Sequence, residues 1–178
     1  MKALKWIGIA LVSVIVLVFV AGMFLPNRYT AQVVVRMNKP PEAVWAAIAD
    51  YEKHPLTGAM RKRTEKLPDE NGLPVWIEDA GETRIRVQVV EATAPRHIKW
   101  VFGDEAVKTM SAWSDTHITA DGGGCVITTN SETNIKSGSW HVPIFRVILT
   151  LTRAHEKGVR DYWASIAAAL GETARFEK

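Results

Sequence analysis

The first feature of the hydrophobic pattern is an unbroken apolar run, Trp6–Leu25, which contains no charge and a single hydroxyl at Ser13. With a rise of about 1.5 Å per residue, a helix over such a run spans the roughly 30 Å hydrocarbon core of a bilayer. The alternative is a cleaved signal peptide, but the run is longer than a signal-peptide core and the small-x-small pattern around Ala21 is poor. We therefore expect an uncleaved signal anchor over residues 1–26, which makes the protein single-pass, and a separate domain over residues 27–178.

Basic residues lie on both sides of this run and decide its predicted orientation. Lys2 and Lys5 precede it, whereas Arg28, Arg36 and Lys39 follow soon after it. The positive-inside rule therefore gives a near tie. Because a very short basic N-terminus usually stays in the cytoplasm, we expect the following domain on the outer, extracytoplasmic side of the membrane.

Beyond the apolar run, the pattern changes to short segments in which apolar and polar residues alternate. In Thr83–Ala92, for example, Ile85, Val87 and Val89 share one face, as expected for a half-buried strand. Turn residues, above all Asn-Gly and Gly-Gly pairs, separate neighbouring segments. Even spacing of short strands predicts an antiparallel meander. The predicted strands are Tyr29–Met37, Arg61–Leu67 (a strand or a loop), Leu73–Asp79, Thr83–Ala92, His97–Phe102, Thr109–Thr119 and Cys125–Ile135.

Two segments of the domain have helical spacing instead. Pro40 and Pro41 suit the first turn of a short helix that ends before Pro55. A second pattern, between Pro143 and Gly171, predicts one amphipathic helix of about 28 residues, which is too polar to cross a membrane. We expect its apolar stripe to lie across the sheet. The stripe consists of Ile144, Val147, Ile148, Leu151, His155, Val159, Tyr162, Ile166 and Leu170.

The predicted fold class is therefore α+β, with a strongly bent antiparallel β-sheet wrapped around a long C-terminal α-helix and one N-terminal transmembrane helix before it. This order resembles the START-like or SRPBCC superfamily of helix-grip proteins, which includes the polyketide cyclase/dehydrase group, and especially its bacterial membrane-anchored members. The resemblance covers about residues 29–171 and implies a cavity between sheet and helix, without a shared catalytic motif. It rests on Pro40–Trp45, Asp50-Tyr51, His54-Pro55, Leu73–Glu78, Val89–Glu91, Pro95-Arg96, Ser111–Trp113, Gly123-Gly124 and Pro143–Arg146.

Charge and cysteine content exclude several other classes. The chain of 178 residues has a net charge of +3, and Lys2 and Lys5 are two of its 22 basic residues, so the other 20 nearly balance the 19 acidic ones. A near-neutral domain lacks the basic field that phosphate backbones require, and we expect no nucleic-acid partner. Cys125 is the only cysteine, which excludes an intramolecular disulfide and a Cys-pair zinc site. We interpret it as a small buried hydrophobe.

Histidines and carboxylates are the candidates for chemistry. The five histidines lack HExxH or HxxxH spacing, so we expect neither a metal site nor a cofactor. Asp115 and His117 share a strand face and have two interpretations: an oriented general base, or a solvated outer face, which we favour. Glu78 shares a face with Trp76 and is either a polar group near the cavity or a rim carboxylate paired with arginine. His155 lies in the apolar stripe of the last helix, as a ligand contact or a hydrogen-bonded core histidine.

Three functions compete on this pattern. We favour a binding module for a hydrophobic small molecule or lipid that is anchored in the membrane by Trp6–Leu25. We assign it no catalytic residues. The second is a polyketide cyclase/dehydrase-like enzyme that uses Glu78, Asp115, His117 or His155 for proton transfer. The third is an envelope domain with a filled core that binds an unknown protein partner. For the favoured function, the predicted cavity residues are Trp76, Glu78, Trp100, Phe102, Trp113, Ile148, Leu151 and His155; Trp140 and Phe145 have a bilayer contact as their alternative.

Overall fold

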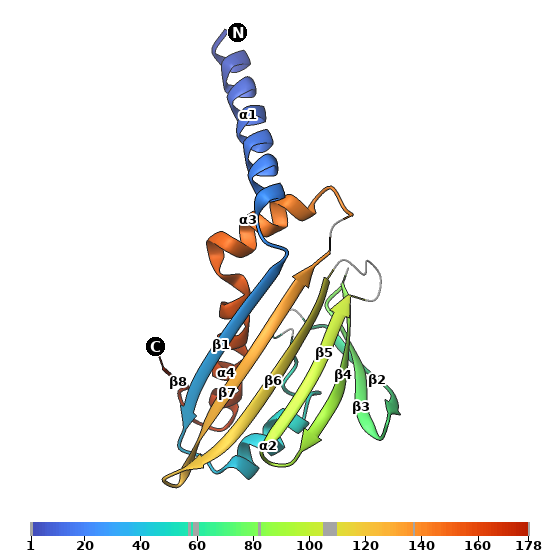
Figure 1. The fold of residues 1–178 in the computed structure, drawn as a ribbon, viewed down its shortest axis with the longest axis vertical. Coiled ribbons are helices and arrows are strands. Elements are labelled where there is room, and N and C mark those ends of the chain that lie inside the picture. Colours follow the sequence, from blue (N-terminus) through green and yellow to red (C-terminus); the bar gives the residue numbers. More distant parts are fainter. Residues whose placement is uncertain are drawn as a thin grey trace.

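A curved antiparallel sheet forms the centre of the protein, and its eight strands follow the order β2-β3-β4-β5-β6-β7-β1-β8 (Figure 1). The computed structural model describes residues 2–56, 58, 61–81, 83–104, 110–136 and 138–177. The strands are β1 (Arg28–Met37), β2 (Arg63–Glu70), β3 (Leu73–Asp79), β4 (Arg84–Thr93), β5 (His97–Asp104), β6 (Met110–Asp121), β7 (Gly124–Ile135) and β8 (Arg175–Phe176). The helices are α1 (Lys2–Phe24), α2 (Pro41–Ala49), α3 (Val142–Thr152) and α4 (Ala154–Ala169).

The concave face of the sheet is the buried one, and α2 and α4 lie against it (Figure 1). Every second residue of β7 is buried, from Cys125 to Ile135, as the pleat of a half-buried strand requires. From α4, Trp163 and Ile166 join the same core cluster as the inward side chains of β1. The predicted α+β helix-grip fold is thus confirmed.

Two of the predicted tight turns owe their form to residues that adopt a positive φ. Asn71 (φ 54°) and Gly72 (φ 76°) join β2 to β3, and Gly122 (φ 55°) and Gly123 (φ 94°) join β6 to β7. Two-residue turns with both residues in this region match the right-handed twist of the flanking strands. The Gly122-Gly123 turn fixes the register between the two longest strands, which contribute much of the cavity wall.

The single long C-terminal helix is a wrong prediction, because the helix breaks at Arg153. This residue adopts a left-handed conformation (φ 50°, ψ 35°) and separates α3 from α4. No proline or glycine marks the break in the sequence, and a left-handed arginine costs roughly 1–2 kcal/mol. The break turns α3 across the end of the sheet, while α4 continues along the concave face (Figure 1). The two halves of the apolar stripe therefore face different surroundings.

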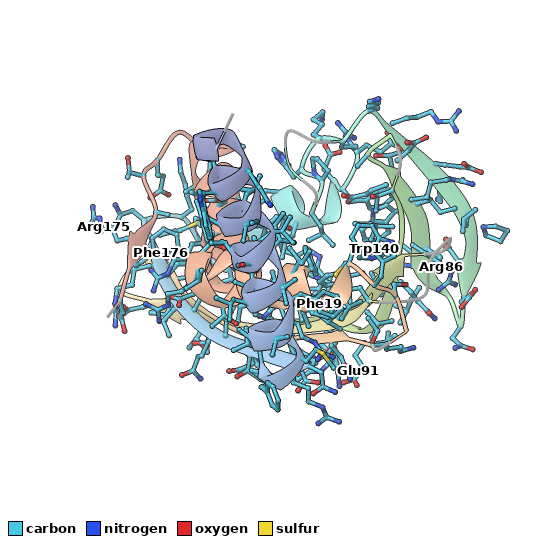
Figure 2. The ribbon with its side chains drawn as sticks, turned by 90° about the horizontal axis from the view of Figure 1, so that it is seen from above. Phe19, Arg86, Glu91, Trp140, Arg175 and Phe176 are labelled. Carbon is cyan, nitrogen blue, oxygen red and sulfur yellow. The ribbon has the colours of Figure 1, made fainter. Side chains whose placement is uncertain are left out.

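Other differences from the predicted elements are small. β3 has the predicted bounds, and most other strands agree to within a few residues, although Thr109 lies outside the described residues. The short helix α2 ends at Ala49, earlier than its predicted limit before Pro55. The two-residue strand β8, labelled by Arg175 and Phe176 in Figure 2, was not predicted. It is too short to carry a periodic signal, and pairing with β1 creates it.

Helix α1 packs on α3 where it leaves the domain (Figure 1). Gly22 is buried there, and a Cβ built on it would lie only 2.0 Å from the carbonyl oxygen of Pro143. The two backbones touch because Gly22 has no side chain. The segment Lys5–Phe24 is, by its length and composition, apolar enough to cross a bilayer.

We expect Gly22→Leu to separate α1 from α3, because the clash involves backbone atoms that cannot rotate away. The overpacking should cost about 1–3 kcal/mol of the packing between the two helices. Spin labels at Leu17 and Leu151 would report this as longer and broader distances in the full chain. Gly8→Leu is the matched control, since nothing lies within 4 Å of a Cβ at Gly8. Unchanged distances in Gly22→Leu would show that the close contact does not hold the helices together.

Candidate functional site

Two neighbouring cavities lie between the concave face of the sheet and the helices. The first, of about 300 Å³, is lined by Leu56, Ile85, Trp100, Phe102, Met110, Ser114, Thr129, Ser131, Thr133, Ala154, His155, Gly158, Val159, Tyr162 and Trp163. The second, of about 230 Å³, is lined by Trp45, Ile48, Ala49, Tyr51, His54, Leu56, Pro74, Trp76, Val89, Ala92, Ile98, Trp100 and Tyr162. We call them the α4 cavity and the α2 cavity. Leu56, Trp100 and Tyr162 belong to both walls and stand between the two spaces.

The α4 cavity lies at the end of the sheet that carries α1. Strand β1 follows α1 directly, and its first residue, Arg28, pairs with Asn134 near the end of β7. At this same end Met110 pairs with Ile135, and both Met110 and the nearby Thr133 line the cavity. The α2 cavity extends from there toward the opposite end, where α2 lies (Figure 1).

Hydroxyl groups form a polar band on the wall of the α4 cavity. Thr129, Ser131 and Thr133 alternate along β7, and their side chains therefore face inward together. The indole nitrogen of Trp163 donates to the Thr129 hydroxyl at 2.9 Å, and the Thr129 and Thr116 hydroxyls lie 3.0 Å apart. An apolar space with a few fixed polar groups is the usual form of a small-molecule site.

His155 bridges this band from the helix side. Its Nε2 lies 3.1 Å from the Ser131 hydroxyl, and its Nδ1 lies 3.0 Å from the Thr133 hydroxyl. Hydroxyls can donate or accept, so they satisfy both nitrogens of a neutral imidazole. Burial lowers the pKa of His155, which outweighs the opposing influence of Ser131 and Glu132. The ring is therefore held neutral at the cavity wall.

Protonation of His155 makes the stability of the protein depend on pH. Because its pKa is lower in the folded than in the unfolded chain, the unfolded chain binds more protons as the pH falls through the ordinary value of 6.5. We expect the free energy of unfolding to fall below about pH 6.5, with a slope of at most about 1.4 kcal/mol per pH unit from this group. Denaturation curves of the full chain and of His155→Gln, compared pH by pH, isolate the contribution. Parallel curves would contradict it.

Glu78 is fully buried and accepts hydrogen bonds from two residues that line the cavities. Its Oε1 accepts hydrogen bonds from the indole nitrogen of Trp76 at 3.1 Å and from the backbone amide of Leu56 at 2.9 Å. The Trp76 ring in turn stacks on Tyr51 at 4.2 Å between centroids. Burial, and then the charge of Glu78, raise the pKa of Tyr162, whose phenol stays protonated between the two cavities.

Half of the eight predicted cavity residues line these walls. Trp76 lines the α2 cavity, Trp100 lines both cavities, and Phe102 and His155 line the α4 cavity. Glu78 lies behind the wall rather than at a rim with arginine. Whether they contact a ligand stays a prediction.

The other predicted cavity residues lie elsewhere. Trp113 alternates with the buried Ala112 and Ser114, so it lies on the convex face of the sheet. Ile148 and Leu151 belong to α3 and are exposed, the latter to 79%. The bend at Arg153 carries them away from the sheet, which the predicted straight helix did not anticipate.

The predicted set of cavity residues did not include Leu56, Trp163 and the hydroxyl band, and it left Tyr162 only in the apolar stripe of the last helix. Threonine and serine at alternate positions of β7 read as a polar face, and the alternation alone cannot tell which face of such a strand points inward. Tyr162 and Trp163 are adjacent on α4, and only the packed helix shows that both reach the cavity. Cys125 is buried as expected, and burial raises the pKa of its thiol to about 11.

Asp115 and His117 lie on the convex face, as the favoured interpretation holds, and are not among the residues that line either cavity. The register of β5 and β6 brings His97 opposite His117. Sequence spacing gave no sign that His97 lies beside Asp115 and His117, because His97 is on another strand.

Comparisons with known proteins agree with this geometry. Residues 28–170 match the model of the family described as polyketide cyclase / dehydrase and lipid transport. Comparison with curated protein sequences gives no match. Among solved structures, a conserved protein from Geobacillus kaustophilus superposes with a TM-score of 0.62 at 12% identity, covering 84% of this chain and 100% of that one.

Two further solved structures also superpose on the chain. Truncated norcoclaurine synthase from Thalictrum flavum has a TM-score of 0.51 at 13% identity, covering 76% of this chain and 90% of its own. The di-domain ARO/CYC StfQ from the steffimycin biosynthetic pathway has a TM-score of 0.56 at 12% identity, covering 83% of this chain. This chain spans about half of StfQ, since 52% of that chain is covered. At such identities the likeness concerns the fold.

Proposed function

Because the chain belongs to the polyketide cyclase / dehydrase and lipid transport family, we propose that it is a membrane-anchored module that binds a hydrophobic small molecule or lipid. The observation that carries the proposal is the α4 cavity, whose wall combines Trp100, Phe102 and Trp163 with the hydroxyl band of β7. Apolar tails gain by leaving water for such a space, and a few hydroxyls suit a polar head group.

The position of the cavity supports a ligand that comes from the bilayer. If α1 crosses the membrane, the end of the sheet with the α4 cavity is the end next to the lipid, because β1 follows α1 after only a few residues. Residues 27–178 then form the domain outside the membrane. This domain lies on the extracytoplasmic side, because a very short basic N-terminus usually stays in the cytoplasm.

Helix α3 adds a second support, because its exposed side is apolar. Trp140, just before the helix, is 77% exposed, and Phe145, Ile148 and Leu151 are exposed on α3 itself. The helix packs against the base of α1, so α3 lies at the level where α1 would leave the bilayer (Figure 1). Tryptophan and amphipathic helices commonly occupy the membrane interface. The apolar side of α3 thus suits contact with lipid next to the cavity.

A cyclase-like enzyme remains the second candidate, and His155 is the observation that favours it. A neutral imidazole on a cavity wall is able to accept a proton from a bound substrate. Glu78 is enclosed by its contacts behind the wall, and Asp115 and His117 are on the convex face, which leaves His155 as the residue for this function. An interaction domain with a filled core is disfavoured by the two cavities.

Native mass spectrometry of the full chain tests the binding function. The protein is extracted in a mild detergent, exposed to a total bacterial lipid extract and released from the micelle in the spectrometer. We expect one reproducible lipid mass per chain. An apo mass with no uptake, across several detergents, would contradict the proposal. A soluble aromatic polyketide that binds in place of lipid and is converted, with the conversion lost in His155→Gln, would favour the enzyme.

A further inference from the structure

A cluster of metal-binding side chains lies on the convex face of the sheet, opposite to the cavities. It consists of His97 on β5 and of Asp115 and His117 on β6. His97 pairs directly with His117 across the two strands, and Asp115 is two residues from His117 on the same face. The three donor atoms lie within 4.8 Å of one another.

The atoms converge on one point. The Oδ1 atom of Asp115 lies 2.8 Å from Nε2 of His97 and 3.3 Å from Nε2 of His117. Two ligands of a tetrahedral zinc ion, each about 2.0–2.1 Å from the metal, are separated by about 3.3 Å. Admission of an ion therefore requires the contact between His97 and Asp115 to open by about 0.5 Å.

The two rings present the same nitrogen to one carboxylate oxygen. The imidazoles are stacked at 4.5 Å between centroids and 18° between planes, and both direct Nε2 toward the same carboxylate oxygen. An ion that replaces these contacts lies in the plane of each ring, so its binding also turns the two stacked rings apart. Two neutral imidazoles and one carboxylate are also the donor set of three-ligand zinc and iron sites that keep a position open.

The surroundings leave room for the ion. The side chains of His97 and Asp115 are about a quarter exposed or less, which holds their positions, whereas that of His117 is 57% exposed and leaves one side open to water. Lys99 pairs with Asp115 in the strand register, but its ammonium group contacts Glu91 at 3.4 Å. That ion pair directs the ammonium group of Lys99 toward the adjacent strand β4.

We propose that His97, Asp115 and His117 bind one divalent transition-metal ion of the zinc class, with water in the remaining position. The site is separate from the cavity function, because its residues belong to the other face of the sheet. Since two strands supply the ligands, the ion clamps β5 to β6. A ligand that binds only the folded chain raises its stability in proportion to the logarithm of its concentration.

The test uses the full chain in detergent, purified without a histidine tag and stripped of metal with a chelator. We expect one equivalent of Zn²⁺ to bind in isothermal titration and to raise the melting temperature. Co²⁺ should give the visible absorption typical of nitrogen- and oxygen-ligated tetrahedral cobalt. Asp115→Asn and His117→Gln should each weaken Zn²⁺ binding at least tenfold, with an unchanged metal-free melting temperature as evidence of folding.

His141→Gln is the matched control, because His141 is an exposed histidine outside the cluster. It should bind Zn²⁺ like the unaltered chain. Absence of binding at one equivalent would overturn the proposal. Equal losses in His141→Gln and His117→Gln would overturn it as well, since they would mean scattered surface binding. Lipid uptake should be the same in His117→Gln as in the unaltered chain, which keeps this result independent of the cavity.

Discussion

Replacing Gly158 by phenylalanine is expected to abolish lipid uptake while leaving the protein folded. Gly158 lies on α4 at the exposed rim of the α4 cavity, and nothing lies within 4 Å of a Cβ built on it. A phenyl ring therefore enters without a backbone clash and occupies much of a space of about 300 Å³. Phenylalanine is also a better helix former than glycine, by a few tenths of a kcal/mol.

Gly158→Ala is the matched control, because a methyl group leaves the cavity open. We expect it to stabilise the helix by up to about 1 kcal/mol and to bind lipid like the unaltered chain. Native mass spectrometry with the bacterial lipid extract should show a bound mass for Gly158→Ala and at least a tenfold weaker one for Gly158→Phe. Thermal unfolding of both variants checks that the loss is not a folding defect.

The pair of variants also separates the cavity from the apolar helix α1 as the origin of a bound lipid. Lipids that adhere to the apolar surface of α1 should remain attached in both variants, because Gly158 belongs to α4 and not to α1. Equal lipid masses in Gly158→Phe and Gly158→Ala, with both proteins folded, would show that the cavity is not the binding site. The membrane anchor would then be the lipid contact, and the module would need another function.

The order of strands and helices was predictable because it depends on periodicity, which is local. Alternation in β4 and β5 and the glycine-rich turn after β6 appear directly in the sequence. The break at Arg153 was not predictable, since neither glycine nor proline marks it. It forms because α3 packs against α1 and across the end of the sheet, a tertiary demand that overrides the helical propensity of the segment.

The candidate site was predictable only where large side chains indicated the inner face. Trp100 and Phe102 lie two residues apart on β5, on the same face as Ile98, and both line the α4 cavity. On β6 the same rule favoured Trp113, but the inner face there carries the smaller Ala112 and Ser114. A cavity is a place where bulky side chains are missing, so small and hydroxylated residues form its wall and size alone misleads. His97 joins Asp115 through strand register, which a linear motif cannot express.

Replacing Glu78 by alanine is expected to destabilise the fold by about 2–5 kcal/mol, more than Gly22→Leu, His155→Gln or either change at Gly158. Glu78 has 0% of its surface exposed, and its carboxylate accepts from both the Trp76 indole and the Leu56 amide. Truncation leaves the buried Trp76 donor and the half-buried Leu56 donor without this acceptor and adds a void next to the Trp76–Tyr51 stack. Leu56 lines both cavities, so its release should also weaken lipid uptake.

The size of this effect distinguishes a buried acceptor from an ordinary carboxylate. Glu78→Gln should lose less stability than Glu78→Ala, because it keeps an oxygen acceptor and most of the side-chain volume in place. Glu91→Ala, on the neighbouring strand β4 and exposed, removes the pair with Lys99 and should change stability by about 0.5 kcal/mol or less (Figure 2). Chemical denaturation of the full chain in detergent, followed by tryptophan fluorescence, measures all three. If Glu78→Ala were no more destabilising than Glu91→Ala, the two hydrogen bonds would not hold the cavity wall, and the role of Glu78 would have to be sought in a bound ligand.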